Sequence, residues 1–318
     1  MLNYIVRRLL LALLIIVVMS FAVFFLIRLL PGDPIEMLVA KNVYIDMTPE
    51  ILDQFRKEKG MDRPLLVQYF DWLGKVFRGD FGVSIMQNYD IGKELGNRIT
   101  VTLILGMTAF IVSLIIGPLL GIISAIRRGG FIDNIVTLIA NIGITAPQFW
   151  IGIMLILLFG VRLNVLPAYG YTLPWVNFGL SVQQSIMPVF VIALGPIAST
   201  ARQTRSSVIE VLGVDYVRTA WAKGLNERKV IFKHVLKNSI MPVVTLQGTM
   251  IRLIIGGSVV VETVFVIPGM GKFMIDAMLS HDYPVVQAVV LVMTVVVVIS
   301  SLVVDLLYGW IDPRIQYE

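Results

Sequence analysis

The sequence contains no cysteine and only two histidines, His234 and His281, in 318 residues. Without cysteine the chain can form no disulfide, no thiolate metal site and no cysteine nucleophile. Two histidines are too few for a histidine-based metal cage, since zinc takes three or four protein ligands. Charged residues are also scarce, at 15% against about 25% in an ordinary soluble domain. In their place 57% of the residues are hydrophobic, which indicates an integral membrane protein.

Positive charge is in modest excess, with 26 basic against 21 acidic residues and a net charge of +5. In a soluble chain such an excess raises the question of nucleic-acid binding. Here the basic residues cluster beside the apolar runs, an arrangement that sets orientation in a membrane. We therefore expect membrane lipid, and no nucleic acid, as a partner. The apolar runs hold neither a Ser/His/Asp arrangement nor a carboxylate pair, so no enzymatic activity is predicted.

Six apolar runs predict an all-α membrane protein with six transmembrane helices, since about 20 apolar residues cross the hydrocarbon core. The runs cover residues 9–27, 99–126, 135–161, 186–200, 243–265 and 285–308. The first run has neither the short length nor the cleavage site of a signal peptide, so it is expected to remain as a helix. Arg7 and Arg8 precede it and place the N-terminus in the cytoplasm, and six crossings return the C-terminus to the same side.

These crossings divide the chain into four parts. Residues 1–30 form an N-terminal transmembrane helix, residues 31–97 a small extracytoplasmic helical insertion, residues 98–308 a five-helix core, and residues 309–318 a cytoplasmic tail. In the insertion, Thr48 is predicted to cap one helix and a second helix is predicted after Pro64. The apolar face of the second helix consists of Leu65, Leu66, Tyr69, Phe70, Leu73, Val76 and Phe77. That face needs a partner, either the membrane interface or the ends of the spanning helices.

Glycine and proline residues predict a close helix contact and a helix kink in the core. Gly117 and Gly121 form a Gly-x-x-x-Gly pair, which lets two helices approach closely, although such pairs are also common by chance. Pro118 implies a kink between them, and Pro147 lies inside the third run. The fourth run is short and holds two prolines, so its bounds are the least defined.

Two ionisable residues, Arg252 and Glu262, lie within the fifth run. Charges at such depth are costly and usually face a bundle interior or a wet cavity. Arg252 is therefore a candidate for a translocation pathway or an inner gate, and pairing with a neighbouring helix is the alternative. Glu262 lies near the outer end of the run, where a role as an interfacial cap is the alternative to a place in the pathway.

The densest positive cluster lies in the predicted cytoplasmic loop, residues 202–242. Its basic residues are Arg202, Arg205, Arg218, Lys223, Arg228, Lys229, Lys233 and Lys237, against only Glu210, Asp215 and Glu227. Gly224 is placed to end one helix, and Asn226 to cap a second helix over residues 227–237. A solvated loop that only fixes topology would explain the charges. An ordered helix pair that carries Tyr216 and Trp221 favours a docking surface for a cytoplasmic protein.

A phosphate-binding loop is absent from the sequence. The segment PGMGKF at residues 268–273 has Val266 where the first glycine of the motif should stand, and Phe273 in place of Ser or Thr. His281 and Asp282 together supply too few ligands for a metal site. If transport is driven by ATP, the ATPase must therefore be another chain.

The run Asp215-Tyr216-Val217-Arg218-Thr219-Ala220, followed by Ala222-Lys223-Gly224-Leu225, resembles the EAA loop of ABC-importer permeases. The closest likeness is to the dipeptide, oligopeptide and nickel variant of that family. The general motif begins Glu-Ala-Ala where this chain has Arg218-Thr219-Ala220, and Trp221 stands where the variant often has Arg or Lys. Further motifs in the family's order cover residues 30–34, 63–69, 79–82, 205–212, 262–265, 268–271, 282–286 and 312–314.

The resemblance implies the bundle of a type I ABC-importer permease in a bacterial or archaeal cytoplasmic membrane. It implies a second homologous permease, two cytoplasmic ATPase subunits that bind ATP and Mg²⁺, and an extracytoplasmic solute-binding protein; this chain would bind no cofactor or metal itself. The residues implied to couple to the ATPase are Asp215, Tyr216, Arg218, Thr219, Ala220, Trp221, Ala222, Lys223, Gly224, Leu225 and Glu227. The expected solute is a dipeptide or oligopeptide, with nickel, a metal chelate or glutathione as alternatives. An ion-coupled secondary transporter is the competing class.

Overall fold

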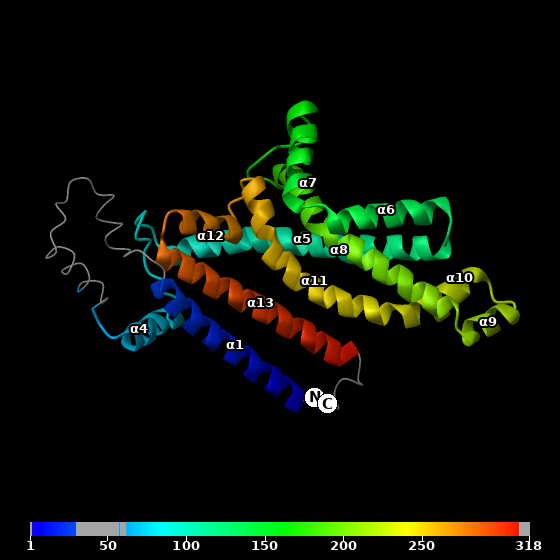
Figure 1. Cartoon of the computed structure of the whole chain (residues 1–318), viewed down its shortest axis with the longest axis horizontal. Coiled ribbons are helices and arrows are strands. Elements are labelled where there is room, and N and C mark those ends of the chain that lie inside the picture. The colour runs from blue at the N-terminus through cyan, green and yellow to red at the C-terminus, as the bar shows by residue number, and fades with distance from the viewer. Residues whose placement is uncertain (1, 30–56, 58–61, 312–318) are drawn as a thin grey trace. The chain divides into compact units, whose positions relative to one another are not determined.

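The structure, a computed structural model, describes residues 2–29, 57 and 62–311, and the chain forms two compact units. Unit 1 comprises residues 1–100 and 269–302, and unit 2 comprises residues 101–268 and 303–318. Within the described residues the regular elements are all helices, and the β pairing there is one isolated bridge between Val83 and Asp90 (Figure 1). The predicted all-α class is confirmed. The predicted cap at Thr48 lies outside the described residues.

In unit 1 the predicted helix after Pro64 is present and packs against the N-terminal helix. It is α4 (Leu65–Phe77), and it lies beside α1 (Leu2–Leu29) in Figure 1. The hydroxyls of Tyr69 on α4 and Ser20 on α1 lie 2.9 Å apart in a buried hydrogen bond. The rest of the predicted apolar face is largely open, with exposed fractions of 57% at Leu66, 65% at Phe70 and 82% at Phe77. Part of that face therefore has α1 as its partner.

Residues 266–284, between the fifth and sixth predicted runs, contain a helix, α12 (Met270–Leu279). It forms because apolar side chains at helical spacing find a core to pack into. That core also includes the start of α5 (Ile91–Ile126) and of α13 (Tyr283–Ile311). Its buried members are Ile91, Leu95, Met270, Phe273, Ala277, Val285, Ala288 and Val289.

Asp282 ties the start of α13 to the segment that precedes α5. Its buried carboxylate accepts a hydrogen bond from the hydroxyl of Ser84. It also accepts from the backbone amides of Ile85 at 3.3 Å and Met86 at 3.4 Å. A carboxylate that satisfies several donors at once fixes a loop, because each donor would otherwise be buried without a partner. Asp282 is therefore a structural residue that fixes the segment before α5.

Unit 2 is built around α8 and α11. Its helical segments are residues 101–126 of α5, α6 (Phe131–Thr145), α7 (Gln148–Leu155), η1 (Ile156–Arg162), α8 (Phe178–Leu212), α9 (Asp215–Ala222), α10 (Glu227–Lys229), η2 (Val230–Val235) and α11 (Leu236–Val264). The segments η1 and η2 are π-helical. Leu105 of α5, Val191 of α8 and Ile254 of α11 are almost fully buried in the core between these helices.

The third apolar run is not one straight helix. It is broken between α6 and α7, whose axes differ by 108°. Pro147 causes the break, because proline lacks a backbone N–H and drives the residue before it out of the helical region. Ala146 accordingly has φ −73° and ψ 133°. The bent pair is either one broken span or a re-entrant loop.

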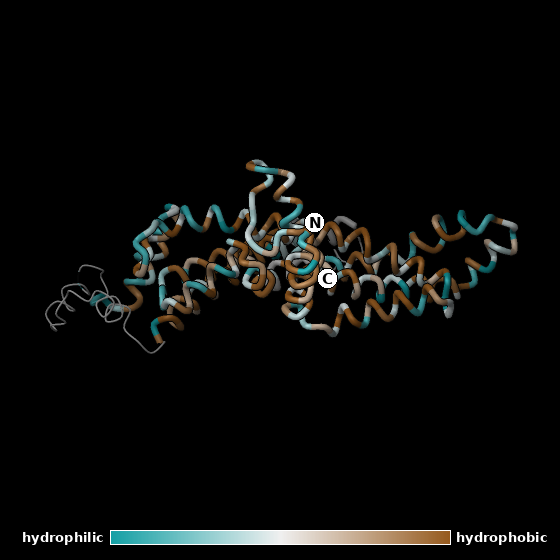
Figure 2. The backbone as a smooth tube through the Cα atoms, turned by 90° about the horizontal axis from the view of Figure 1, so that it is seen from above, coloured by the Kyte–Doolittle hydropathy of each residue, from teal (hydrophilic) through white to brown (hydrophobic). Residues whose placement is uncertain are grey.

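Four described helices are long and apolar enough to cross a membrane, or five spans if the bent pair counts as one. The four helices cover Tyr4–Leu29, Ile91–Ile126, Phe178–Leu212 and Tyr283–Leu306. The fourth predicted run, residues 186–200, is the middle of the 35-residue helix α8, which tolerates both of its prolines. The predicted run at residues 243–265 lies almost wholly within α11. Figure 2 shows apolar residues along most of these helices.

Gly117 and Gly121 lie at a close contact between α5 and α8. A Cβ atom on Gly117 would lie 2.7 Å from the Cβ of Thr200, and one on Gly121 would lie 2.5 Å from the carbonyl oxygen of Ala201. Both distances are shorter than side chains permit. The close approach predicted from the Gly-x-x-x-Gly pair is therefore confirmed.

Candidate functional site

The coupling segment, defined here as residues 215–229, has the helix end expected at Gly224. Gly224 has φ +75°, a left-handed conformation that glycine adopts without strain. Its amide donates to the carbonyl of Trp221 at 2.8 Å, and the amide of Leu225 donates to the carbonyl of Ala220 at 3.3 Å. These two bonds form a Schellman motif, which satisfies the last carbonyls of α9.

The second helix of the pair begins as predicted and ends much later. The Asn226 side chain accepts a hydrogen bond from the amide of Arg228 at 3.1 Å and caps α10. The prediction that this helix ends at Lys237 is wrong. The chain passes from α10 through η2 directly into α11, which ends at Val264. Asn238 and Ser239 after Lys237 do not end the helix, and Pro242 is accommodated within α11.

A buried cluster holds the coupling segment against the end of α8. Val217 of α9 and Val230 of η2 are both fully buried and pack with Val208 of α8. The hydroxyl of Tyr216 accepts a 2.7 Å hydrogen bond from Asn238 Nδ2. The segment is therefore an ordered part of unit 2, at the end of α8 (Figure 1).

Most residues expected to couple to an ATPase lie on the exposed side of this segment. Those exposed are Asp215, Tyr216, Arg218, Thr219, Trp221, Ala222, Lys223, Gly224 and Glu227. Leu225 is half-buried, and Ala220 is 5% exposed and faces the cluster. Ala220 thus holds the segment in place, and the exposed residues are open to a partner.

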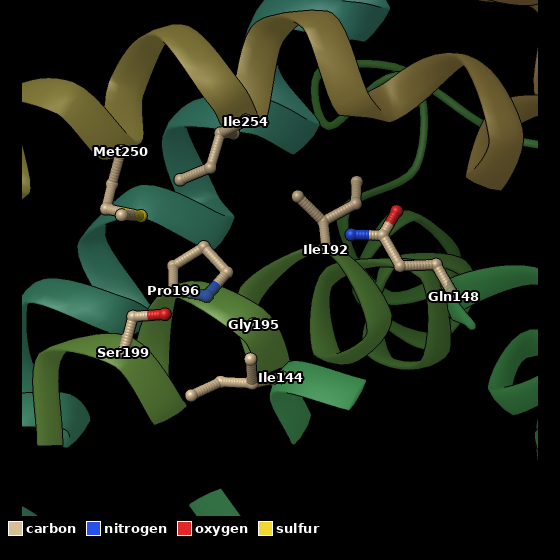
Figure 3. Close-up of a pocket in the computed structure, with 8 residues that line it drawn as sticks. All are labelled: Ile144, Gln148, Ile192, Gly195, Pro196, Ser199, Met250 and Ile254. Atoms are coloured by element: carbon tan, nitrogen blue, oxygen red, sulfur yellow. The ribbon is translucent and has the colours of Figure 1, made fainter. Parts of the chain in front are cut away.

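A pocket of about 310 Å³ lies in unit 2, between the α6–α7 bend, α8 and α11. It is lined by Ile144, Gln148, Ile192, Gly195, Pro196, Ser199, Met250 and Ile254. Figure 3 shows Met250 and Ile254 reaching from α11 toward α8, and the Gln148 amide pointing toward Ile192. Pro196 cannot donate to the Ile192 carbonyl, because proline has no N–H. Among the described residues the lining therefore offers an amide and a hydroxyl among apolar groups, and no ionisable side chain.

The two residues proposed for the pathway have different surroundings. Arg252 is on α11 between Met250 and Ile254, and the contacts of its side chain lie outside the described residues. The Glu262 side chain is 0% exposed. Its Oε1 atom accepts a 2.7 Å hydrogen bond from the hydroxyl of Thr102 on α5. Glu262 is therefore packed between α11 and α5 in this structure.

Sequence reasoning missed the buried carboxylate of Asp133, at the start of α6. This residue is 3% exposed and accepts hydrogen bonds from Arg205 Nε at 2.7 Å and Nη2 at 2.8 Å. The Ser124 hydroxyl donates to it at 2.5 Å and the Gly129 amide at 2.8 Å. Asp133 lies between two of the predicted runs, and Arg205 was counted only among the basic residues of the cytoplasmic loop and in the motif at residues 205–212. The distance of 72 residues between them hides the pair from a sequence pattern.

Several long apolar helices and a bent helix pair define the class as a multi-pass membrane protein. Residues 117–317 match the model of the binding-protein-dependent transport system inner membrane component, and residues 1–114 match the model of its N-terminal part. The chain therefore belongs to the family of inner-membrane components of binding-protein-dependent transport systems. Members of this family are transport subunits and not enzymes.

Relatives match the chain over nearly its whole length. A putative peptide permease protein of Brucella suis is 39% identical over 319 residues, which cover 99% of each chain. The oligopeptide transport system permease protein AppB of Bacillus subtilis is 38% identical over 317 residues, also with 99% of each chain covered. A structure of the MetNI methionine ABC transporter matches with a TM-score of 0.56 and 16% identity, over 69% of this chain and 96% of that one. At that identity the match shows the fold alone, that of an ABC-importer permease.

Proposed function

We propose that this chain is a permease subunit of an ATP-driven importer and forms half of the pathway for dipeptides or oligopeptides. The observation that carries the coupling role is the ordered segment at residues 215–229, held by its buried side and exposed on the other. The peptide assignment is supported by the full-length similarity to permeases named for peptides and oligopeptides.

The proposed assembly has a second homologous permease, two cytoplasmic ATPase subunits and an extracytoplasmic solute-binding protein. ATP and Mg²⁺ would be bound by the ATPase subunits, since this chain has no phosphate-binding loop. Closure of the ATPases on ATP would displace the coupling segments of both permeases. The two bundles would then rotate and open a central path to the outside.

The proposed topology has six spans in the cytoplasmic membrane of a bacterium or archaeon, with both termini in the cytoplasm and residues 31–97 outside. Counting α11 and the α6–α7 pair as one span each, alongside the four long helices, supports this number. The basic residues of the coupling segment support its cytoplasmic side, because inner loops carry an excess of Lys and Arg.

The pocket beside Pro196 is the part of the proposed pathway that bears on the solute. An amide and a hydroxyl among apolar groups suit the backbone and side chains of a peptide. A bare nickel ion would find no histidine or carboxylate ligand in this lining. These features favour a peptide over nickel, and a metal chelate or glutathione are the alternatives left to experiment.

Uptake in the host strain, where the partner subunits are present, tests this proposal. Deletion of the gene is expected to abolish uptake of radiolabelled peptides, and a plasmid copy to restore it. The purified complex in proteoliposomes is expected to need ATP and Mg²⁺ for transport. Transport that persists without ATP would indicate the ion-coupled class instead. Uptake of nickel, a chelate or glutathione but of no peptide would overturn the peptide assignment.

Arg252 and Glu262 are the proposed pathway or gate residues. Arg252→Ala is expected to lower peptide uptake while the complex still assembles. The reason is that a charged side chain at that depth of α11 is costly, and such residues usually serve a function. Arg252→Lys is the matched control that keeps the charge. Normal uptake by Arg252→Ala would remove this residue from the pathway.

A further inference from the structure

The carboxylate of Asp133 is the junction of three helices in unit 2. It accepts from Ser124 on α5, from the backbone of the turn at Gly129, and from both Nε and Nη2 of Arg205 on α8, while it sits itself on α6. A fork-shaped guanidinium that meets a carboxylate with two parallel bonds fixes both distance and orientation. The side chain of Asp133 is only 4% exposed, so its carboxylate is shielded from water, while the side chain of Arg205 is 33% exposed.

Other contacts join the same helices along their length. Arg202 Nη2 on α8 donates to Asn141 Oδ1 on α6 at 2.6 Å. A Cβ atom on Gly143 of α6 would lie 3.1 Å from the Cβ of Ala198 on α8. The Gly117 and Gly121 contacts bring α5 against the other side of α8. Helices in such close contact at several points resist sliding past one another, because protein interiors resist continuous deformation.

The position of Arg205 on α8 places this junction between the two parts of the candidate site. Ser199 in the pocket lies six residues before it, about 9 Å along the axis at 1.5 Å per residue. Val208, which packs under the coupling segment, lies three residues after it, about 4.5 Å along the axis. Along α8, the pocket residues therefore come first, the Asp133–Arg205 junction next, and the contact with the coupling segment last.

We propose that Asp133 and Arg205 are positioning residues that lock α5, α6 and α8 into one rigid lever between the coupling segment and the pocket. This inference rests on the proposed function, since it concerns how ATP-driven motion reaches the pathway. With the lock in place, displacement of α9 moves the pocket wall formed by α8 and by the end of α6. Without it, α8 moves alone and the pocket does not open, although ATP is still hydrolysed.

The first test separates this role from simple stability. Asp133→Asn leaves the Arg205 charge without its partner and is expected to lower the amount of assembled complex. The double variant Asp133→Asn/Arg205→Gln removes both charges and is expected to restore assembly, because it is the loss of one partner that is costly. Peptide transported per ATP hydrolysed is nevertheless expected to fall about tenfold in the double variant, within the usual range of coupling between sites.

Arg205→Lys is the conservative comparison. It keeps the charge and loses the two-pronged geometry, so its transport per ATP should lie between the wild-type and the double-variant values. A double variant that assembles and transports the wild-type amount of peptide per ATP overturns the proposal. So does an Arg205→Lys variant with unchanged coupling.

The second test uses the natural absence of cysteine. A disulfide between Gly143→Cys and Ala198→Cys would fasten α6 to α8; their Cβ separation of 3.1 Å is below the roughly 3.5–4.5 Å of a disulfide, so the two helices must part slightly to form it. If the helices move as one body, the oxidised protein transports as well as the reduced protein. Transport lost on oxidation and regained with a reductant would mean that α6 slides past α8, and would overturn the lever.

Failure of the lever can be told from failure of the proposed function. If the wild-type complex does not couple ATP hydrolysis to peptide uptake, the proposed function is wrong. If it does and the variants above keep that coupling, only the lever is wrong.

Discussion

The hydroxyl of Thr102 on α5 donates a 2.7 Å hydrogen bond to the Glu262 carboxyl group on α11, and both side chains are almost completely buried. This buried polar pair joins two helices of unit 2. Removing either partner takes a hydrogen bond from a buried polar group, which is costly.

Glu262→Ala is expected to lower the free energy of unfolding by about 1–3 kcal/mol, because it leaves the Thr102 hydroxyl buried without this acceptor. Glu262→Gln keeps an oxygen in the same place and should lose little. Thermal unfolding of the detergent-solubilised protein measures the difference. Equal melting temperatures for the two variants would show that this hydrogen bond does not hold α5 to α11.

Gly121→Ala is expected to destabilise the protein by about 1–3 kcal/mol, since the added methyl group would collide with backbone of α8 and force the helices apart. The contact is 2.5 Å, to the Ala201 carbonyl oxygen. Gly96→Ala is the matched control on the same helix, with nothing within 4 Å of the added Cβ. It should stabilise α5 by about 0.5–1 kcal/mol through helix propensity.

The comparison is made by thermal unfolding in detergent, with the yield of assembled complex as a second readout. If Gly121→Ala is as stable as Gly96→Ala, the close approach of α5 and α8 is not needed for the fold.

Gly224→Val is expected to uncouple ATP hydrolysis from transport. Its positive φ would strain any β-branched residue by about 1–2 kcal/mol. The space around Gly224 is open, so the new side chain would project where an ATPase is proposed to dock. ATPase activity and peptide uptake are measured on the same proteoliposomes.

Gly224→Asn distinguishes the two causes, because asparagine tolerates the left-handed conformation while still adding a side chain. If both variants uncouple, the side chain obstructs docking; if only valine does, the helix end is distorted. Full coupling in the valine variant would contradict a coupling role for this turn.

A feature of the fold or of the candidate site could be predicted from the sequence where its physical cause lies in one or a few neighbouring residues. The helix end at Gly224 and the cap at Asn226 follow from the conformations of single residues, and both were predicted. The break at Pro147 was visible as a proline, but its 108° bend depends on packing around α7. The junction at Asp133 could not be predicted, because its partner Arg205 is 72 residues away and no periodicity links them. Ala220 was taken for a docking residue because small side chains suit both a partner's approach and a tight core.

Tyr89 supplies the last prediction, on pH dependence. Burial raises the pKa of its phenol above the ordinary value of 10.0, and the negative charge of Asp282 raises it further. The unfolded chain therefore releases this proton at a lower pH than the folded one. Its contribution to stability is complete below about pH 10 and is lost as the pH rises through the higher folded pKa. Tyr89→Phe removes the titrating group, so its melting temperature should fall less between pH 9 and pH 11 than that of the wild type. Parallel curves for the two proteins would show that the phenol feels neither the burial nor the charge of Asp282.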